Sequence, residues 1–311
     1  MIKNDASYEI LDLMARYEND TEAALKAETS PECLYAFSPL RENLFEWTEI
    51  QGDSRVLQIG SDYGSYTGLL ARRAGETVVL DPRDENLEVN RLRHGTYGNL
   101  RFVRGDILKP EAGYKEYKPG NGTAPLEFPG EGFDLIFMAG TLEQYKKEEA
   151  EAVLKAAAGL LKPEGTLYFA AENAAGVRYW MGAERFDVSF LRAEVLELLE
   201  SLEGTYGGSS LLYYPVPDYR YPAAVYSDAY LPENGEVTNI SARTDLRKRG
   251  AGHGHGMQER SIFQLCQFVP GSVQERTVMR QIIYVKYNRT RSEKFQLKTA
   301  IVREPPGCPP R

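Results

Sequence analysis

Cysteine and histidine are scarce in this chain of 311 residues, which contains three of each. Cys33, Cys266 and Cys308 lie far apart, and their spacing fits neither a zinc site nor a disulfide framework. An odd, scattered set of cysteines indicates a reducing compartment. His253 and His255 form an H-x-H pair in a glycine-rich stretch, but no acid or cysteine stands at ligand spacing from them. The sequence therefore predicts no metal site.

Long apolar runs and excess positive charge are also missing. No stretch approaches the ~18 consecutive apolar residues that a membrane span needs. The first twenty residues are acidic and amphipathic, without the basic start and apolar run of a signal peptide. The net charge of −8 gives no general attraction to nucleic acid, and we interpret the basic run at 243–249 as a solvated loop. We expect a cytoplasmic protein that associates with neither membrane nor nucleic acid.

What is present is an ordinary globular composition, with 42% hydrophobic and 26% charged residues. From residue 55 onward, short apolar segments alternate with helical patterns, which is typical of right-handed crossovers and a parallel sheet. The strands are expected at 55–60, 77–81, 99–106, 133–140 and 166–173, with two late strands at 281–288 and 295–302. These segments predict a doubly wound, mostly parallel α/β sheet of seven strands.

The segments around the predicted strands set the expected organisation of the chain. Residues 109–131 are rich in Pro and Gly and are interpreted as a surface insertion, whereas 146–165 and 189–204 have helical patterns. A further helix is expected at 40–47, with Ser38 as its N-cap. The predicted parts are an N-terminal helical cap (1–50), an α/β core (51–205), C-terminal strands with a lid (206–304) and a flexible tail (305–311).

A glycine turn follows the first predicted strand. Gly60, Ser61, Asp62 and Gly64 lie between that strand and the next helix, where glycines let the backbone approach a ligand closely. In open α/β sheets, ligands bind outside the carboxyl ends of the strands. Two glycines four residues apart are a weak signal, and a purely structural turn explains them equally well.

Two aspartates follow the second and third predicted strands. Asp81, before Pro82, stands about twenty residues after the glycine turn, as an acid that grips a ribose diol does. Asp106, between Gly105 and Ile107, is placed to accept the exocyclic amine of adenine. Either could be an ordinary capping or loop acid, but their order indicates a nucleoside ligand. Asp62 at the middle glycine position would repel a diphosphate, which favours a phosphate-free sulfonium cofactor, S-adenosylmethionine.

The same segments resemble the class I S-adenosylmethionine-dependent methyltransferases. The resemblance rests on RVLQIGSDYG, VVLD, RGDIL, FDLIFMAGTLEQY and LLKPEGTLYFA, which together cover roughly residues 55–172. It implies a Rossmann-like methyltransferase fold and a cofactor site to which Gln58 and Ala139 also contribute. Two positions depart from the family: Gln58 stands where Glu is usual, and Asp62 where Gly is usual.

A narrower resemblance involves SPLRENLFEW, AENAAGVRYWMG and YYPVPDYRYPAAVYSDAYLP. These segments are similar to bacterial methyltransferase-domain proteins found beside, or fused to, glycosyltransferases. The resemblance implies a glycan-like or other small-molecule acceptor and a glycosyltransferase as a partner. The YYPVPDYRYP segment would then form a lid on the acceptor side, although it could equally be an edge segment packed on the sheet.

Methyl transfer is an in-line displacement, in which the protein aligns the nucleophile and excludes water, and a hydroxyl nucleophile also needs a proton acceptor. The candidate catalytic residues at strand ends or in the following loops are Glu143, Glu172 and Tyr145. The candidate acceptor-binding residues are Asn173, Tyr179, Trp180, Asp218 and Tyr219. A helix cap, strand-end hydrogen bonds and core packing are the structural alternatives.

Three hypotheses follow for the whole chain. The first is an active methyltransferase that acts on a hydroxyl or amine. The second is a non-catalytic binding or scaffold module that keeps the fold, a hypothesis favoured by Gln58 and Asp62. The third is an enzyme that uses the fold for another nucleoside or another reaction. The sequence does not identify the acceptor or the oligomeric state.

Overall fold

The computed structural model describes residues 4–118, 124–126, 132–180, 182–216, 218–227 and 283–288. Several predictions concern segments outside these described residues. They are the strand at 295–302, the basic run at 243–249, the loop with His253 and His255, and the tail at 305–311.

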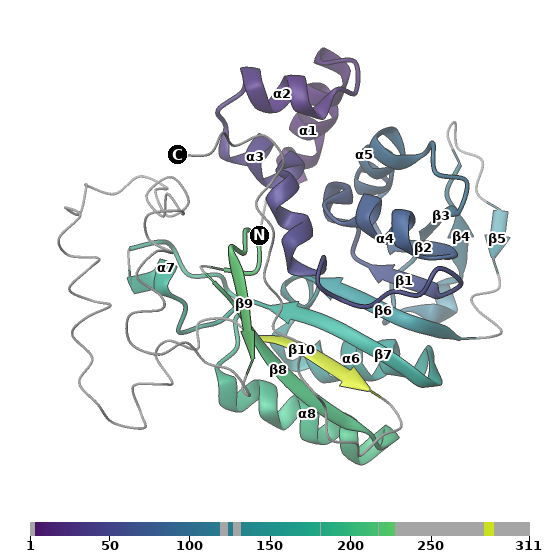
Figure 1. Ribbon diagram of the computed structural model, residues 1–311, viewed down its shortest axis with the longest axis vertical. Coiled ribbons are helices and arrows are strands. Elements are labelled where there is room, and N and C mark those ends of the chain that lie inside the picture. Colours follow the sequence, from purple (N-terminus) through teal and green to yellow (C-terminus); the bar gives the residue numbers. More distant parts are fainter. Residues whose placement is uncertain are drawn as a thin grey trace.

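Five parallel strands form the centre of the sheet (Figure 1). They are β1 (Arg55–Ile59), β2 (Glu76–Asp81), β3 (Leu100–Arg104), β6 (Phe133–Ala139) and β7 (Leu161–Ala171). Their spatial order is β3-β2-β1-β6-β7, so the strand order reverses between β1 and β6. The carboxyl ends of all five strands meet at one edge, as predicted for a doubly wound α/β sheet.

Antiparallel strands extend the sheet on both sides, to ten strands among the described residues. On one side β10 (Ile283–Asn288) lies between β7 and β8 (Ser209–Val216), and β9 (Ala224–Ser227) forms the edge. On the other side the predicted insertion contains a hairpin of β4 (Tyr114–Glu116) and β5 (Ala124–Leu126). The predicted count of seven is wrong because β4, β5, β8 and β9, which were not predicted as strands, extend the sheet by pairing at its open edges.

Helices cover both faces of the sheet (Figure 1). On one face lie α4 (Thr67–Arg73) and α5 (Asp84–His94), and on the other α6 (Ala150–Gly159) and α8 (Arg192–Tyr206). Apolar residues of β6 and β7 pack against α6 and α8 in the larger of the buried clusters. The helix predicted at 146–165 is shorter, because the chain turns after α6 and Leu161 already pairs with Phe133 in the sheet.

The N-terminal residues form a small helical unit that lies against the glycine turn. Its elements are α1 (Asn4–Arg16), α2 (Thr21–Ala27), α3 (Pro31–Phe37) and the 3₁₀ helix η1 (Pro39–Leu44). α1 packs on α5, and α3 packs on the short 3₁₀ helix η2 (Asp62–Gly64). The helix predicted at 40–47 is therefore a 3₁₀ helix, and the Ser38 side chain makes no capping hydrogen bond to it.

The short elements that remain lie in loops between strands. They are the 3₁₀ helices η3 (Pro110–Ala112), η4 (Leu142–Gln144) and η5 (Lys147–Glu149), and the one-turn helix α7 (Val177–Trp180). η4 follows β6 and α7 follows β7, so both lie at the carboxyl edge of the sheet.

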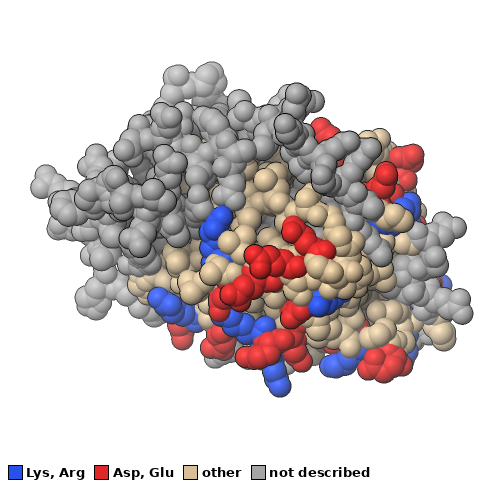
Figure 2. Space-filling view, turned by 90° about the horizontal axis from the view of Figure 1, so that it is seen from below, with Lys and Arg blue, Asp and Glu red and all other residues tan. Residues whose placement is uncertain are grey.

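Charged side chains of both signs are interspersed over the described part of the face that Figure 2 shows. Some of these charges form ion pairs between neighbouring helical elements. For example, Lys147 Nζ of η5 lies 2.6 Å from Glu194 Oε1 of α8. Among the described helices, none combines the length and the apolar composition that a membrane crossing requires.

Candidate functional site

Backbone hydrogen bonds join the ends of neighbouring strands where the predicted cofactor residues lie. The Gly60 N–H donates to the Leu80 carbonyl over 2.8 Å, and the Gly105 N–H donates to the Asp81 carbonyl over 3.2 Å. The Gly140 N–H donates to Ala170 over 3.2 Å. The glycine turn and both predicted nucleoside-binding aspartates are thus brought together at one edge of the sheet.

The conformation of the glycine turn requires glycine at two positions. Gly60 and Gly64 have φ angles of +81° and +79°, which residues other than glycine rarely adopt. A Cβ at Gly60 would lie 2.7 Å from Thr141 Oγ1, and one at Gly64 would lie 2.9 Å from Asn90 Oδ1. The turn is therefore shaped by close packing as well as by its backbone angles.

Gln58 supports the glycine turn from inside the protein. Its fully buried side chain donates from Nε2 to the carbonyls of Gly60 and Ser61, each over 3.3 Å. Its Oε1 accepts from the Thr67 hydroxyl over 2.7 Å, and that hydroxyl in turn accepts from Asn90. A glutamate could not donate to the two carbonyls, so glutamine at this position has a definite structural role.

Asp81 closes the turn at the end of β2. Its Oδ2 accepts from the Ser61 N–H and hydroxyl, both over 2.8 Å, and from Asn86 over 3.1 Å. Oδ1 accepts from the Arg83 N–H over 2.9 Å, which leaves this oxygen capacity for a further donor. The carboxylate is fully buried, whereas the neighbouring Pro82 is exposed.

Asp106 lies beside a cavity of about 700 Å³ at the end of β3. Its Oδ1 accepts from the Leu108 N–H over 3.0 Å and from the Tyr145 hydroxyl over 2.8 Å. Ile107, next to it, is buried. Burial, followed by the hydrogen bond to Asp106, raises the pKa of Tyr145. Tyr145 is thus placed on the predicted adenine side, which does not support its proposed role as a proton acceptor.

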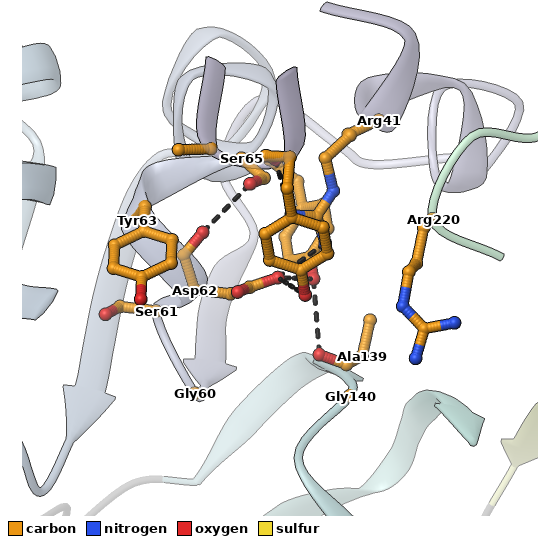
Figure 3. A network of polar contacts seen from close by, with 12 residues as sticks. Arg41, Gly60, Ser61, Asp62, Tyr63, Ser65, Ala139, Gly140 and Arg220 are labelled. Atoms are coloured by element: carbon orange, nitrogen blue, oxygen red, sulfur yellow. Dashed lines mark hydrogen bonds and ion pairs between the residues drawn. The ribbon is translucent and has the colours of Figure 1, made fainter. Parts of the chain in front are cut away.

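Asp62 is paired with an arginine from the N-terminal unit (Figure 3). Its Oδ2 lies 2.5 Å from Arg41 Nη2, and it also accepts from the Tyr35 hydroxyl over 3.0 Å. Arg41 is 1% exposed, and its guanidinium lies 3.9 Å from the centre of the Tyr35 ring. The negative charge that the sequence places at the usual glycine position is therefore neutralised within the protein.

The end of β6 is enclosed by two tyrosines. The Ala139 carbonyl accepts from the Tyr66 hydroxyl over 3.2 Å. Gly140 has a φ of +69°, and a Cβ there would lie 3.2 Å from the Tyr219 hydroxyl. Tyr219 comes from the turn between β8 and β9, so this edge hairpin reaches across to the carboxyl end of the central sheet.

Glu143, Glu172 and Arg220 form a charged group at the carboxyl ends of β6 and β7, which we call the β6–β7 cluster. Glu143 Oε1 accepts from the Glu172 N–H, and its Oε2 is buried without a hydrogen-bond partner. Glu172 Oε2 lies 2.6 Å from Arg220 Nη2. Burial raises the pKa of Glu143 to about 7, with Arg220 opposing the shift and Glu172 adding to it. Glu143 can therefore exchange a proton near neutral pH.

The predicted acceptor-binding residues divide into two groups. Tyr179 donates its hydroxyl to Glu172 Oε1 over 2.6 Å and so joins the β6–β7 cluster. Asn173 and Asp218 use side-chain oxygens to accept from backbone N–H groups two residues ahead, which forms turns. Trp180 ends α7, and its side chain lies outside the described residues.

Arg41 and Arg220 escaped prediction from the sequence. Both lie in segments whose resemblance was noted, SPLRENLFEW and YYPVPDYRYP, but an arginine in a polar segment is usually solvated. An unpaired acid at the family's glycine position was the available signal for Arg41, because a buried carboxylate needs a cation. Nothing comparable in the sequence indicated Arg220.

The geometry fits an adenosine-containing sulfonium cofactor. The backbone of the glycine turn, Asp81 Oδ1 and Asp106 Oδ2 are the groups that would hold it, and of these Asp106 lines the cavity. When bound, the cofactor supplies an activated methyl group. Within the described part of the chain, no group of three His, Cys, Asp or Glu residues is arranged to hold a metal ion.

Comparisons with known proteins agree with this geometry. Residues 57–169 match the family described as "Methyltransferase domain". Phosphoethanolamine N-methyltransferase 1 of Arabidopsis thaliana is 29% identical over 114 residues, 37% of this chain and 20% of that protein. Phosphoethanolamine N-methyltransferase 3 of the same plant is 28% identical over 145 residues, 47% of this chain and 24% of that protein. The matches thus span about a fifth to a quarter of the length of these relatives.

Among solved structures, the N-methyltransferase NodS from Bradyrhizobium japonicum WM9, in complex with S-adenosyl-L-homocysteine, is similar. It is 14% identical with a TM-score of 0.45, and the comparison covers 93% of this chain and 100% of that one. The ordered glycine turn, the strand-end aspartates and the family match lead to one assignment. Residues 57–169 of this chain are a class I S-adenosylmethionine-dependent methyltransferase domain, with S-adenosylmethionine as the cofactor that the sequence predicted.

Proposed function

We propose that this protein transfers the methyl group of S-adenosylmethionine to an amine or hydroxyl of a small-molecule acceptor. The observation that carries the proposal is Glu143, whose buried Oε2 has no partner and whose carboxyl has a pKa of about 7. This carboxyl follows β6, next to the glycine turn, and lines the same cavity as Asp106. These observations support Glu143 as the proton acceptor beside the predicted cofactor site.

In the proposed reaction Glu143 takes the proton that the acceptor nitrogen or oxygen loses. The backbone N–H of Glu172 orients Glu143, and the Glu172 carboxylate, held by Arg220 and Tyr179, contributes negative charge. The phenol of Tyr219 encloses the end of β6 and limits access of water. Alignment and exclusion of water are the main contributions a protein makes to such a displacement.

Between amine and hydroxyl, an amine is the better supported acceptor. The plant relatives are named for methylation of the nitrogen of phosphoethanolamine, and a carboxylate pair beside the cofactor suits a cationic amine. The glycan-like acceptor and the glycosyltransferase partner that the narrower resemblance implied stay predictions.

Cofactor binding tests the proposal directly. Isothermal titration calorimetry should detect both S-adenosylmethionine and S-adenosylhomocysteine, and Asp81→Asn should weaken binding about tenfold because one charged acceptor for the ribose is lost. The matched control is Asp53→Asn, an exposed aspartate at the amino end of β1, which should bind as the unaltered protein does. A folded protein that binds neither compound would refute the proposal.

The scaffold hypothesis has lost the observations that favoured it. Asp62 is paired with Arg41, and Gln58 donates to the turn, so both departures from the family are accommodated without blocking the site. Turnover of S-adenosylmethionine by the protein in the presence of a panel of small amines would eliminate this hypothesis.

A further inference from the structure

Arg220 carries a buried donor that the protein itself does not use. The residue is 8% exposed, and one end of its guanidinium, Nη2, is bound to Glu172. The other end, Nη1, is buried and has no hydrogen-bond partner among the described residues. Leaving a charged N–H unpaired in the interior costs free energy, so such a donor is expected to have a ligand.

The position of Arg220 relates this donor to the predicted reaction site. Figure 3 shows its side chain reaching from the β8–β9 turn toward Gly140 at the end of β6. Its guanidinium lies 4.8 Å from the centre of the Phe186 ring and 4.5 Å from that of Tyr219. Phe186 and Glu143 both line the cavity that Asp106 borders. Arg220 therefore packs directly against Phe186, a residue of the cavity wall.

The chemistry around the donor selects its ligand. The guanidinium packs against two aromatic rings, and its fork of N–H donors matches the oxygens of a carboxylate or phosphate. Glu143 and Glu172 lie on the other side of the same cluster and suit a cationic amine. A small molecule with an amine at one end and an oxyanion at the other would meet both kinds of group.

We propose that Arg220 Nη1 binds an oxyanionic group, carboxylate or phosphate, of the methyl acceptor and so determines which amines are methylated. This inference rests on the proposed function and specifies its acceptor class. The methionine carboxylate of the cofactor is the competing source of an oxyanion. Arg41 of η1 is bound to Asp62 in the glycine turn, whereas Arg220 is bound to Glu172 after β7, on the proposed acceptor side.

The experiment uses inorganic phosphate as the probe and measures its binding by the broadening of its ³¹P NMR line at constant ionic strength. Phosphate is titrated into the full-length protein, first alone and then after saturation with S-adenosylhomocysteine. We expect saturable binding in both states. Absence of saturable binding, or displacement of phosphate by S-adenosylhomocysteine, would overturn the assignment to the acceptor.

Two variants of Arg220 separate binding from folding. Arg220→Lys keeps a cation beside Glu172, but a single ammonium cannot bind Glu172 and phosphate as the two ends of a guanidinium can. Phosphate affinity should therefore fall about fivefold or more. Arg220→Gln removes the charge and should reduce it about tenfold or more. Arg101→Gln, on an arginine that pairs with Glu76 at the amino end of the sheet, is the matched control. Equal phosphate affinity in Arg220→Lys and the control would contradict the inference.

Failure of the inference about Arg220 can be distinguished from failure of the proposed function. A protein that does not bind S-adenosylhomocysteine refutes the methyltransferase proposal, whatever phosphate does. A protein that binds S-adenosylhomocysteine but not phosphate refutes the role of Arg220 alone. With small amines as acceptors, Arg220→Lys should raise KM for amines that carry an oxyanion more than KM for neutral amines, and an equal rise for both classes would contradict the inference.

Discussion

At the scale of single residues, the hydrogen-bond direction through Gln58 leads to an unexpected prediction. Gln58→Glu restores the residue usual in the family, but it places a carboxylate against the carbonyls of Gly60 and Ser61. The lost donors and the added repulsion should cost about 1–3 kcal/mol of unfolding free energy in urea titrations. Binding of S-adenosylhomocysteine should weaken as well, whereas Gln58→Met should lose stability without the repulsion. A Gln58→Glu variant as stable as the unaltered protein would show that these bonds contribute little.

The raised pKa of Glu143 predicts a dependence of stability on pH. The carboxyl titrates near its ordinary value in the unfolded chain but at about 7 in the folded protein. Folding thus favours the protonated form of Glu143. The contribution of this group to the free energy of unfolding is present at low pH and is lost as the pH rises through 7. Compared with Glu143→Gln, the unaltered protein should become progressively less stable between pH 5 and pH 8. Paired urea titrations of the two proteins at several pH values would measure the difference, and a constant difference would contradict the prediction.

At the scale of elements, the Arg41–Asp62 pair attaches the N-terminal helical unit to the glycine turn. Arg41→Leu leaves the Asp62 carboxylate without its cation and should cost about 3 kcal/mol in urea unfolding. Asp62 has a φ of +40°, so Arg41→Leu combined with Asp62→Gly removes both the unpaired charge and the backbone strain. The double variant should recover much of the loss.

The control for this prediction is Arg72→Leu, which breaks the more exposed pair with Glu42. That change should cost less than about 1 kcal/mol because solvent screens such pairs. If the double variant were no more stable than Arg41→Leu, the cost would lie in lost packing of Arg41 and the ion pair would not explain it.

The elements also differ in how well the sequence predicts them. The central strands were predictable because each contains a short buried apolar run, which in all but β7 ends in or leads into glycine or aspartate, and the parallel order follows from the intervening helices. The hairpin of β4 and β5 was not, because its residues are polar and its pairing depends on the open edge of β3. For the site, the aspartates were predictable from their distance along the chain. Arg220 was not, since its neighbours come from β6, β7 and the loop with Phe186.

At the scale of the whole molecule, two segments distant from the family match complete the site. The N-terminal unit contributes Arg41 to the glycine turn, and the β8–β9 hairpin contributes Tyr219 and Arg220 to the ends of β6 and β7. The predicted cofactor-binding residues therefore lie within 57–169, whereas several groups proposed for the acceptor come from outside that segment.

The last described strand connects these parts, which leads to a prediction for the whole chain. β10 pairs with β7 on one side and β8 on the other, so the hairpin that carries Arg220 is attached to the central sheet through it. Val285→Pro removes a backbone donor from this interior strand and should lower the thermal unfolding midpoint by several degrees. Val285→Thr keeps the N–H and a β-branched side chain, and should change the midpoint much less. Because the hairpin would lose its register, Val285→Pro should also weaken phosphate binding more than binding of S-adenosylhomocysteine. Equal losses of both would indicate that β10 supports the entire domain rather than the acceptor side.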